Sequence, residues 1–179
     1  MPRGFSIMES LVGVFIITLL LLATYSIFIL SQQTQRKVDD RAEAVQNERA
    51  ILDRLSRELR QANKTVTVLP ANEIIFEDGH GNLDSDPIQY LRYYLSGTDL
   101  YREVRYYYFV AAPETHVRYD ETDENSNPPS LQVSEDRLVG EYINSLSFSG
   151  SDTITITIAF NKNNQILNLS TDVVPRNAN

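Results

Sequence analysis

Residues Leu11 to Leu30 read LVGVFIITLLLLATYSIFIL, and this stretch decides how the chain must be organised. It lies inside a longer run of 26 uncharged residues between Glu9 and Arg36. A helix needs about 20 apolar residues to cross the roughly 30 Å hydrocarbon core of a bilayer. A cleaved secretory signal has a shorter apolar stretch followed by a small-residue cleavage site, and no such site follows Leu30. The stretch therefore predicts a membrane-spanning helix that contacts lipid through residues 10–30.

The rest of the chain has the composition of a water-soluble domain. The 179 residues include 16 Lys+Arg and 24 Asp+Glu, which gives a formal net charge of -8. A chain of this charge repels polyanions, so we expect no direct nucleic-acid binding. The absence of Cys excludes disulfides, thiolate metal sites and a Cys nucleophile within the chain. The length fits one domain plus an anchor better than two independent domains.

The helix is expected to continue beyond the membrane span as an amphipathic segment over residues 32–64. No Gly or Pro occurs between residues 32 and 63, and helix-favouring residues are abundant there. One apolar stripe follows the helical repeat and comprises Val38, Ala42, Val45, Leu52, Leu55, Leu59 and Ala62. The charged residues between these positions are expected to face water, and they include Arg41, Glu48, Arg49, Arg57 and Glu58.

After Lys64 the apolar residues follow the two-residue period of β-strands. Apolar side chains alternate with polar ones over residues 154–160 and again over 167–173, and the polar segment Asn161–Asn164 lies between them. This pattern predicts an antiparallel hairpin. A second set of strands is predicted at Ile74–Phe76, Ile88–Leu95 and Leu100–Val104. The segment Tyr119–Ser130, YDETDENSNPPS, should be a solvated loop.

Together these patterns predict an α+β fold. A long N-terminal α-helix, with its first half transmembrane, should pack the second half of its length on an antiparallel β-sheet. The β-rich globular domain should occupy residues 65–179.

The first twelve residues, MPRGFSIMESLV, contain a second informative pattern. Glu9 stands at the entrance of the uncharged run, where a carboxylate is costly unless it has a partner or a use. One explanation is local, because Ser6-x-x-Glu9 fits a capping box in which each side chain bonds the other residue's backbone N–H. The local pattern alone leaves capping and other uses of Glu9 open.

The same residues resemble the signature of type IV prepilins. That signature is a short basic leader ending in Gly, then Phe, a Glu four positions later and a long apolar helix, and Gly4, Phe5, Glu9 and Ser10–Leu30 match it. The resemblance implies a leader over residues 1–4, cleavage after Gly4 by prepilin peptidase and N-methylation of Phe5. It also implies a transmembrane and assembly helix over residues 5–31 and a pilin-like fold.

The resemblance supplies an orientation that the flanking charges do not. It implies a single pass through the cytoplasmic membrane, with the N-terminus cytoplasmic, the C-terminal domain outside, and later incorporation into a pilus or pseudopilus. Glu9 would then be an assembly residue. Cleavage creates an ammonium on Phe5, and pairing of this ammonium with Glu9 of a neighbouring subunit would offset the cost of placing either charge in low dielectric.

Two further segments are similar to one branch of this family. ERAILDRLSRELRQANKT, residues 48–65, and QYLRYYLSGTDLYREV, residues 89–104, resemble PilW-like minor pilins and J-type pseudopilins of type II secretion. The implied function is a minor subunit that helps to initiate or cap a type IV pilus, and a J-type pseudopilin of a secretion system is the alternative. The implied partners are prepilin peptidase, other minor and major pilins, and the inner-membrane assembly platform.

Other candidate sites have a structural interpretation that is favoured over a functional one. Seven of the ten Tyr lie between Tyr90 and Tyr108 and are expected to be half-buried strand residues. His80 and His116 stand in separate polar contexts and are expected at the surface. Oxygen ligands suit Ca²⁺, but the spacing of the following carboxylates matches no EF-hand loop: Asp84, Asp86, Asp120, Glu121, Asp123 and Glu124.

We therefore predict no catalytic residue, no metal site and no cofactor, and we expect that the protein is not an enzyme. Two rival classes stay open. An uncleaved single-pass binding module or sensor would need no Gly4–Phe5 junction. A tethered enzyme would need a convergent polar site, for which the sequence contains no motif.

Overall fold

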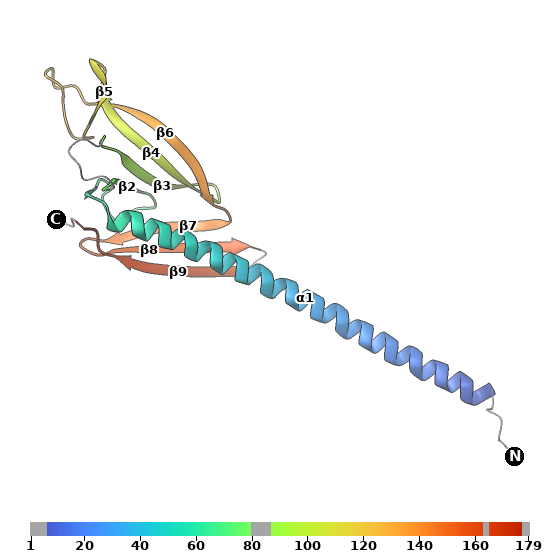
Figure 1. Ribbon diagram of the computed structural model, residues 1–179. Coiled ribbons are helices and arrows are strands. Elements are labelled where there is room, and N and C mark those ends of the chain that lie inside the picture. The colour runs from blue at the N-terminus through green and yellow to red at the C-terminus, as the bar shows by residue number, and fades with distance from the viewer. Residues whose placement is uncertain (1–6, 80–86, 163–164, 177–179) are drawn as a thin grey trace. The chain divides into compact units, whose positions relative to one another are not determined.

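The computed structural model describes residues 7–79, 87–162 and 165–176 (Figure 1). The chain divides into two compact units, Met1–Glu43 and Ala44–Asn179, called here the N-terminal and C-terminal units. Helix α1 spans Ile7–Arg60 and contributes to both units. The predicted α+β class, with a long N-terminal apolar helix and antiparallel sheets, is confirmed.

The described part of the N-terminal unit consists of the first part of α1. The segment Ile7–Gln35, 29 residues, is long and apolar enough to cross a membrane by length and composition. A helix of this length extends about 43 Å, more than the roughly 30 Å of bilayer hydrocarbon. Its large apolar side chains are exposed, for example Phe15 at 62% and Leu22 at 59%. Apolar exposure on this scale is typical of a surface that lipid or other helices cover.

The C-terminal unit contains the remainder of α1 and nine described strands. Their bounds are β1 Lys64–Thr65, β2 Ile74–Glu77, β3 Tyr90–Ser96, β4 Asp99–Phe109, β5 Ala112–Val117, β6 Ser130–Gly140, β7 Ile143–Gly150, β8 Ile154–Lys162 and β9 Gln165–Val173. They form two antiparallel sheets rather than the single sheet of the prediction. One has the order β1-β2-β3-β4-β5 with β6 also paired to β4, and the other has the order β7-β8-β9.

Two tight turns explain how neighbouring strands connect. Strands β3 and β4 pair in register from Tyr90–Arg105 to Ser96–Asp99, and Gly97 in the turn adopts φ +65. Gly150 ends β7 with φ +108, and a Cβ there would lie 2.0 Å from the backbone oxygen of Thr153. Both turns therefore require the freedom of glycine.

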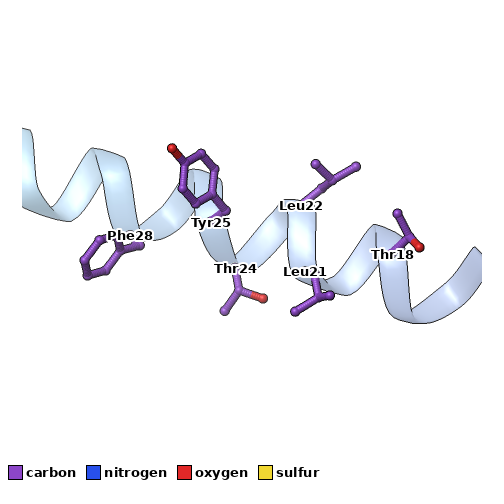
Figure 2. Close-up of a pocket in the computed structure, with 6 residues that line it drawn as sticks. All are labelled: Thr18, Leu21, Leu22, Thr24, Tyr25 and Phe28. Carbon is purple, nitrogen blue, oxygen red and sulfur yellow. The ribbon is translucent and has the colours of Figure 1, made fainter. Parts of the chain in front are cut away.

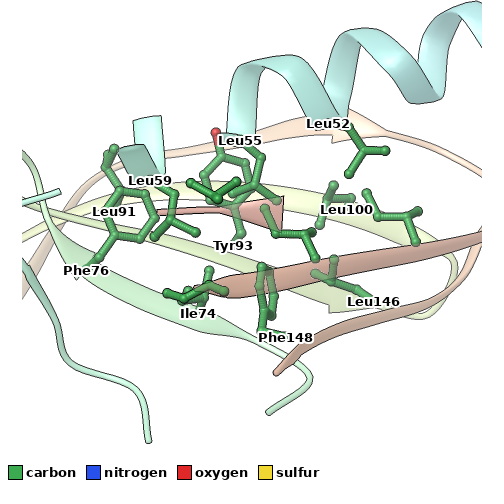
Figure 3. Packing of buried hydrophobic residues seen from close by; sticks show 14 of the residues in the cluster. Leu52, Leu55, Leu59, Ile74, Phe76, Leu91, Tyr93, Leu100, Leu146 and Phe148 are labelled. Carbon is green, nitrogen blue, oxygen red and sulfur yellow. The ribbon is translucent and has the colours of Figure 1, made fainter. Parts of the chain in front are cut away.

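The core of the C-terminal unit lies between α1 and both sheets. Leu52, Leu55 and Leu59 on the helix are buried against apolar side chains of the two sheets, as Figure 3 shows. The six-stranded sheet contributes Ile74, Phe76, Leu91, Tyr93, Leu100 and Val104. The three-stranded sheet contributes Ile143, Leu146, Phe148, Ile154, Ile156, Ile158, Phe160 and Val173.

The predicted helical stripe is only partly correct. Leu52, Leu55, Leu59 and Ala62 are buried as predicted, whereas Val45 is half-buried and Val38 is 60% exposed. Val38 belongs to the N-terminal unit, so the stripe is buried only within the C-terminal unit.

The prediction that Glu48 and Glu58 face water is wrong. Both are buried. The helix packs against side chains of both sheets, so the face it buries is wider than a stripe laid on one sheet would require.

Most strand predictions are confirmed, but the set is incomplete. The hairpin over 154–160 and 167–173 is β8–β9, paired without a register shift. Strand β4 extends to Phe109, five residues beyond the predicted end. The sequence did not predict four strands, β1, β5, β6 and β7. The segment from Tyr119 is irregular as expected until Ser130, where β6 begins.

Candidate functional site

Glu9 lies in the first turn of α1 and is exposed. It is the only acidic residue in the predicted span Ile7–Gln35. Gly4, Phe5 and Ser6 lie outside the described residues, so the cleavage junction and the Ser6 cap stay predictions. A carboxylate in the first turn is favoured by the positive end of the helix dipole.

Hydroxyl groups within the helix bond to its own backbone. Thr18 donates to the carbonyl of Val14 at 2.8 Å, and Ser26 donates to the carbonyl of Leu22 at 2.9 Å. Thr24 and Thr34 likewise donate to the carbonyls of Leu20 and Leu30. Because each hydroxyl is satisfied within the helix, these polar residues can face hydrocarbon at little cost.

A shallow hollow lies on the surface of this helix (Figure 2). It is lined by Thr18, Leu21, Leu22, Thr24, Tyr25 and Phe28. The Thr hydroxyls are bonded to the backbone, so the exposed lining is mainly carbon. A surface of this kind can accept a lipid chain or the side chains of another helix, and it offers no group for catalysis.

In the C-terminal unit, the end of α1 is joined to the six-stranded sheet by an ion-pair cluster around Glu58. The guanidinium of Arg102 on β4 approaches the two Glu58 oxygens, with Nε at 3.0 and 3.2 Å. The hydroxyl of Tyr93 on β3 donates to Glu58 at 2.7 Å. On the helix itself, Arg54 Nε lies 3.2 Å from Glu58. Removing any one partner would leave a buried charge less compensated.

The surroundings of Glu58 favour its ionised form. Burial opposes ionisation, but the hydrogen bonds from Tyr93 and Arg102 outweigh it, so the pKa of Glu58 lies below its ordinary value. Burial, together with the neighbouring Glu58 charge, raises the pKa of the Tyr93 phenol. The cluster is thus a carboxylate–guanidinium pair with a neutral phenol, an arrangement that fixes the helix on the sheet.

A second ion-pair network lies on the same sheet. Arg92 contacts Glu73 at 2.5 Å and Glu103 at 3.4 Å, and Arg105 contacts Glu103 at 2.5 Å. Glu103 and Arg105 are both buried. These charges are paired with each other, so none is free to act as a catalytic acid or base in this arrangement.

The tyrosines between residues 90 and 108 are mainly structural, as predicted. Tyr90 and Tyr93 are fully buried, and the other five are half-buried on β3 and β4. Tyr94 stacks on Tyr101 with ring centroids 5.6 Å apart, and Arg92 covers Tyr94 at 4.2 Å. The ring faces of Tyr94 that Tyr101 and Arg92 cover are therefore not available to a ligand.

His116 is half-buried rather than at the surface as predicted. Its ring stacks on Tyr106 at 4.1 Å, and Nδ1 lies 3.1 Å from the carbonyl of Ile88. The strand β5, which the sequence did not predict, places it against the sheet. His80 lies outside the described residues.

Two of the acidic residues considered above as cation ligands, Asp120 and Asp123, stabilise the loop after β5. Asp120 pairs with Lys64 at 2.8 Å. Asp123 accepts from the backbone N–H groups of Asn125 and Asn127 at 2.9 and 2.7 Å. Asp84 and Asp86 lie outside the described residues. Among the residues that the structure describes, no three His, Asp or Glu side chains converge to hold a metal ion.

A second hollow is lined by Asn72, Glu73, Tyr94, Leu95, Asn144, Ser145 and Leu146. Its principal polar groups are already engaged, because Glu73 pairs with Arg92 and the Tyr94 hydroxyl donates to Asp136 at 3.0 Å. The hollow therefore brings together no set of free catalytic groups.

Sequence reasoning missed Glu48 and Glu58. Glu58 is recognisable only once Tyr93 and Arg102 are brought beside it by the fold. The burial of Glu48 could have been predicted from its spacing. It precedes Leu52 by four residues, Leu55 by seven and Leu59 by eleven, which places it on the buried helix face.

No protein family, curated protein or solved structure matched this chain in the comparisons.

Proposed function

We propose that the chain is a type IV pilin-like structural subunit, processed after Gly4 and anchored by α1. The observation that supports this most is an apolar helix segment, Ile7–Gln35, whose one charged side chain is the exposed carboxylate of Glu9 in its first turn. The same helix continues into a second unit, where it packs against side chains of two antiparallel sheets. Within the family, a minor pilin that initiates or caps a type IV pilus is the assignment we favour.

Glu9 is the residue on which the proposal depends. An exposed carboxylate at the edge of an apolar surface is costly in hydrocarbon unless an opposite charge meets it. Cleavage after Gly4 would supply that charge as the Phe5 ammonium of a neighbouring subunit. Because both charges are compensated only when subunits stand in one register, the pair would favour ordered assembly over isolated insertion.

The rest of the helix surface supports the same function. Its large apolar side chains are exposed, and its hydroxyls bond to its own backbone. Such a surface can be covered first by lipid and then by other subunits without leaving the hydroxyls of Thr18, Thr24, Ser26 and Thr34 unpaired. The proposed partners are prepilin peptidase, major and minor pilins, and the inner-membrane assembly platform. A J-type pseudopilin would use the same surface, and the subunits that co-purify distinguish the two.

The test compares two substitutions of Glu9. Glu9→Gln keeps a side chain able to cap the helix but removes the charge, whereas Glu9→Ala removes both. If charge pairing drives assembly, both variants insert into the membrane normally and enter sheared filaments on the order of tenfold less than the wild type. Immunoblots of membranes and of filaments measure the two amounts.

Asp53→Asn is the matched control, because Asp53 is an exposed carboxylate elsewhere on α1. It should enter filaments at the wild-type level. Normal incorporation of Glu9→Gln with failure of Glu9→Ala would show that capping is what matters. Normal incorporation of both would contradict the proposed role of Glu9.

A further inference from the structure

Glu48 is a fully buried carboxylate without a partner. Its side chain is 0% exposed, and neither Oε1 nor Oε2 has a hydrogen-bond partner among the residues that the structure describes. This contrasts with Glu58 on the same helix, which has three. A buried carboxylate in such a place is stable mainly in its neutral, protonated form.

The helix turn that carries Glu48 is packed closely against the start of the three-stranded sheet. Ile51, which follows Glu48 by one helix turn, packs tightly on Gly140 of β6. A Cβ added at Gly140 would lie 2.6 Å from Cδ1 of Ile51 and 3.0 Å from Cδ1 of Ile143. Leu52, four residues after Glu48, belongs to the core. Glu48 precedes Ile51 by three residues and Leu52 by four, so it lies on the helix face that makes this apolar contact.

The charged side chains that the structure describes near this contact do not compensate Glu48, and that of Lys162 lies outside the described ones. Arg49 and Asp53 on α1 are exposed, and so is Glu141 between β6 and β7. Lys162 ends β8, the strand that pairs with β7. No ion pair joins any described residue to Glu48. Burial alone raises the pKa of Glu48 to about 7.

We infer that Glu48 is a proton-operated latch, in which the protonated side chain keeps the segment Ala44–Leu52 docked on β6 and β7 and ionisation releases it. The reason is the difference in solvation between the two forms. A neutral carboxyl group can remain in the apolar contact, but a carboxylate must reach water to be solvated, and it can do so only if this part of the helix moves away.

The direction of the pH dependence follows from the raised pKa. The docked segment binds the proton more tightly than the released one, so docking is most stable below the ordinary carboxyl pKa, near 4.3. That stabilisation is lost progressively as the pH rises and is gone above about 7, where docked Glu48 also ionises. Acidification therefore closes the latch.

The latch lies where the C-terminal unit begins, at Ala44. The protonation of Glu48 therefore decides how many turns of α1 are packed on the sheets of the C-terminal unit. This inference does not depend on cleavage after Gly4 or on filament assembly. If the unit lies outside the cytoplasmic membrane, as proposed above, the latch would respond to external pH.

Hydrogen exchange of the full chain in detergent micelles tests the latch. Peptides covering residues 44–52 are followed at pH 5.5 and pH 8.5, with exchange corrected for the intrinsic effect of pH. We expect local opening to increase about thirtyfold at the higher pH, as a shift of the Glu48 pKa from about 4.3 in the open segment to about 7 in the docked one requires. In Glu48→Gln and Glu48→Leu, opening should change less than about twofold, because no proton is bound there.

Two replacements are used because Gln is isosteric but polar, whereas Leu matches the apolar face around it. Glu141→Gln is the matched control at the same end of the unit, and it should keep the full wild-type response. The inference is overturned if wild-type opening does not depend on pH, or if the response persists in both Glu48 variants. It is also overturned if Glu141→Gln abolishes the response.

Discussion

Three carboxylates on one helix occupy three different environments. Glu9 is exposed in the first turn of an apolar span, Glu48 is buried without a partner, and Glu58 is buried with Arg102, Tyr93 and Arg54. Their chemistry follows from these surroundings. Glu9 needs a partner from outside the chain if it enters hydrocarbon. Burial raises the pKa of Glu48 to about 7, so it binds a proton more tightly than an ordinary carboxylate, whereas Glu58 is ionised at neutral pH.

Glu58 provides a stability prediction. Glu58→Gln leaves Arg102, whose side chain is 13% exposed, without its main counter-charge, so we expect a loss of about 3 kcal/mol in the free energy of unfolding. Tyr93→Phe removes one hydrogen bond to a charged group and should cost about 2 kcal/mol. Urea unfolding followed by tyrosine fluorescence measures both, since nine of the ten tyrosines lie in the C-terminal unit.

Arg54→Gln is the control for this series. The Arg54 side chain is 38% exposed, and solvent screens its pair with Glu58, so the cost should stay below about 1 kcal/mol. Because the pKa of Glu58 is lowered, the stabilisation is present above the ordinary carboxyl pKa and is lost as the pH falls through the folded value. The difference in the free energy of unfolding between the wild type and Glu58→Gln should therefore become smaller in acid. A difference in the free energy of unfolding that stays constant down to pH 3 would contradict the assignment of Glu58 as an ionised, paired carboxylate.

Residue identity alone could not reveal these roles. Glu48 and Glu58 both occupy charged positions between apolar ones in the sequence, and their burial depends on two sheets packing against the same helix. The partners of Glu58 lie 35 and 44 residues away in sequence. Gly4, Phe5 and Glu9 were found from a local pattern, which is why a single sequence was sufficient to propose them.

At the scale of elements, the predictions were most accurate where the apolar period was regular. The long helix, β2, the β3–β4 pair and the β8–β9 hairpin were all anticipated. Strands β5 and β6 were not, because they are exposed along most of their length and so lack an alternating apolar pattern. The prediction of one sheet instead of two was wrong because the apolar pattern of a strand does not specify which strand it pairs with.

The helix segment within the C-terminal unit is the element on which both sheets depend. Leu55 is 0% exposed and lies in the core cluster between them. Leu55→Ala should therefore reduce the free energy of unfolding by about 3 kcal/mol, through lost burial and a residual cavity. Urea unfolding gives the value.

Val68→Ala is the control for this substitution, because Val68 is 87% exposed. It should change the free energy of unfolding by less than about 0.5 kcal/mol. A cost for Leu55→Ala that is no larger than the cost for Val68→Ala would show that α1 does not organise this core.

At the scale of the whole chain, the difference in composition between the two units fits two surroundings, hydrocarbon for the N-terminal unit and water for the C-terminal unit. The N-terminal unit carries the apolar surface that a membrane or other helices must cover. The C-terminal unit buries its own apolar core and carries most of the acidic residues. One helix contributes to both units, and this combination is what the proposed membrane-anchored subunit requires.

The most direct measurement is the mass and N-terminal sequence of the native chain extracted from membranes. The account predicts a polypeptide that begins at an N-methylated Phe5 and lacks Met1–Gly4. Gly4→Val should retain the leader, whereas Gly13→Val should be processed normally, because a Cβ at Gly13 meets nothing within 4 Å. A wild-type chain that still carries Met1, or a Gly4→Val chain that is cleaved as efficiently as the wild type, would contradict the account.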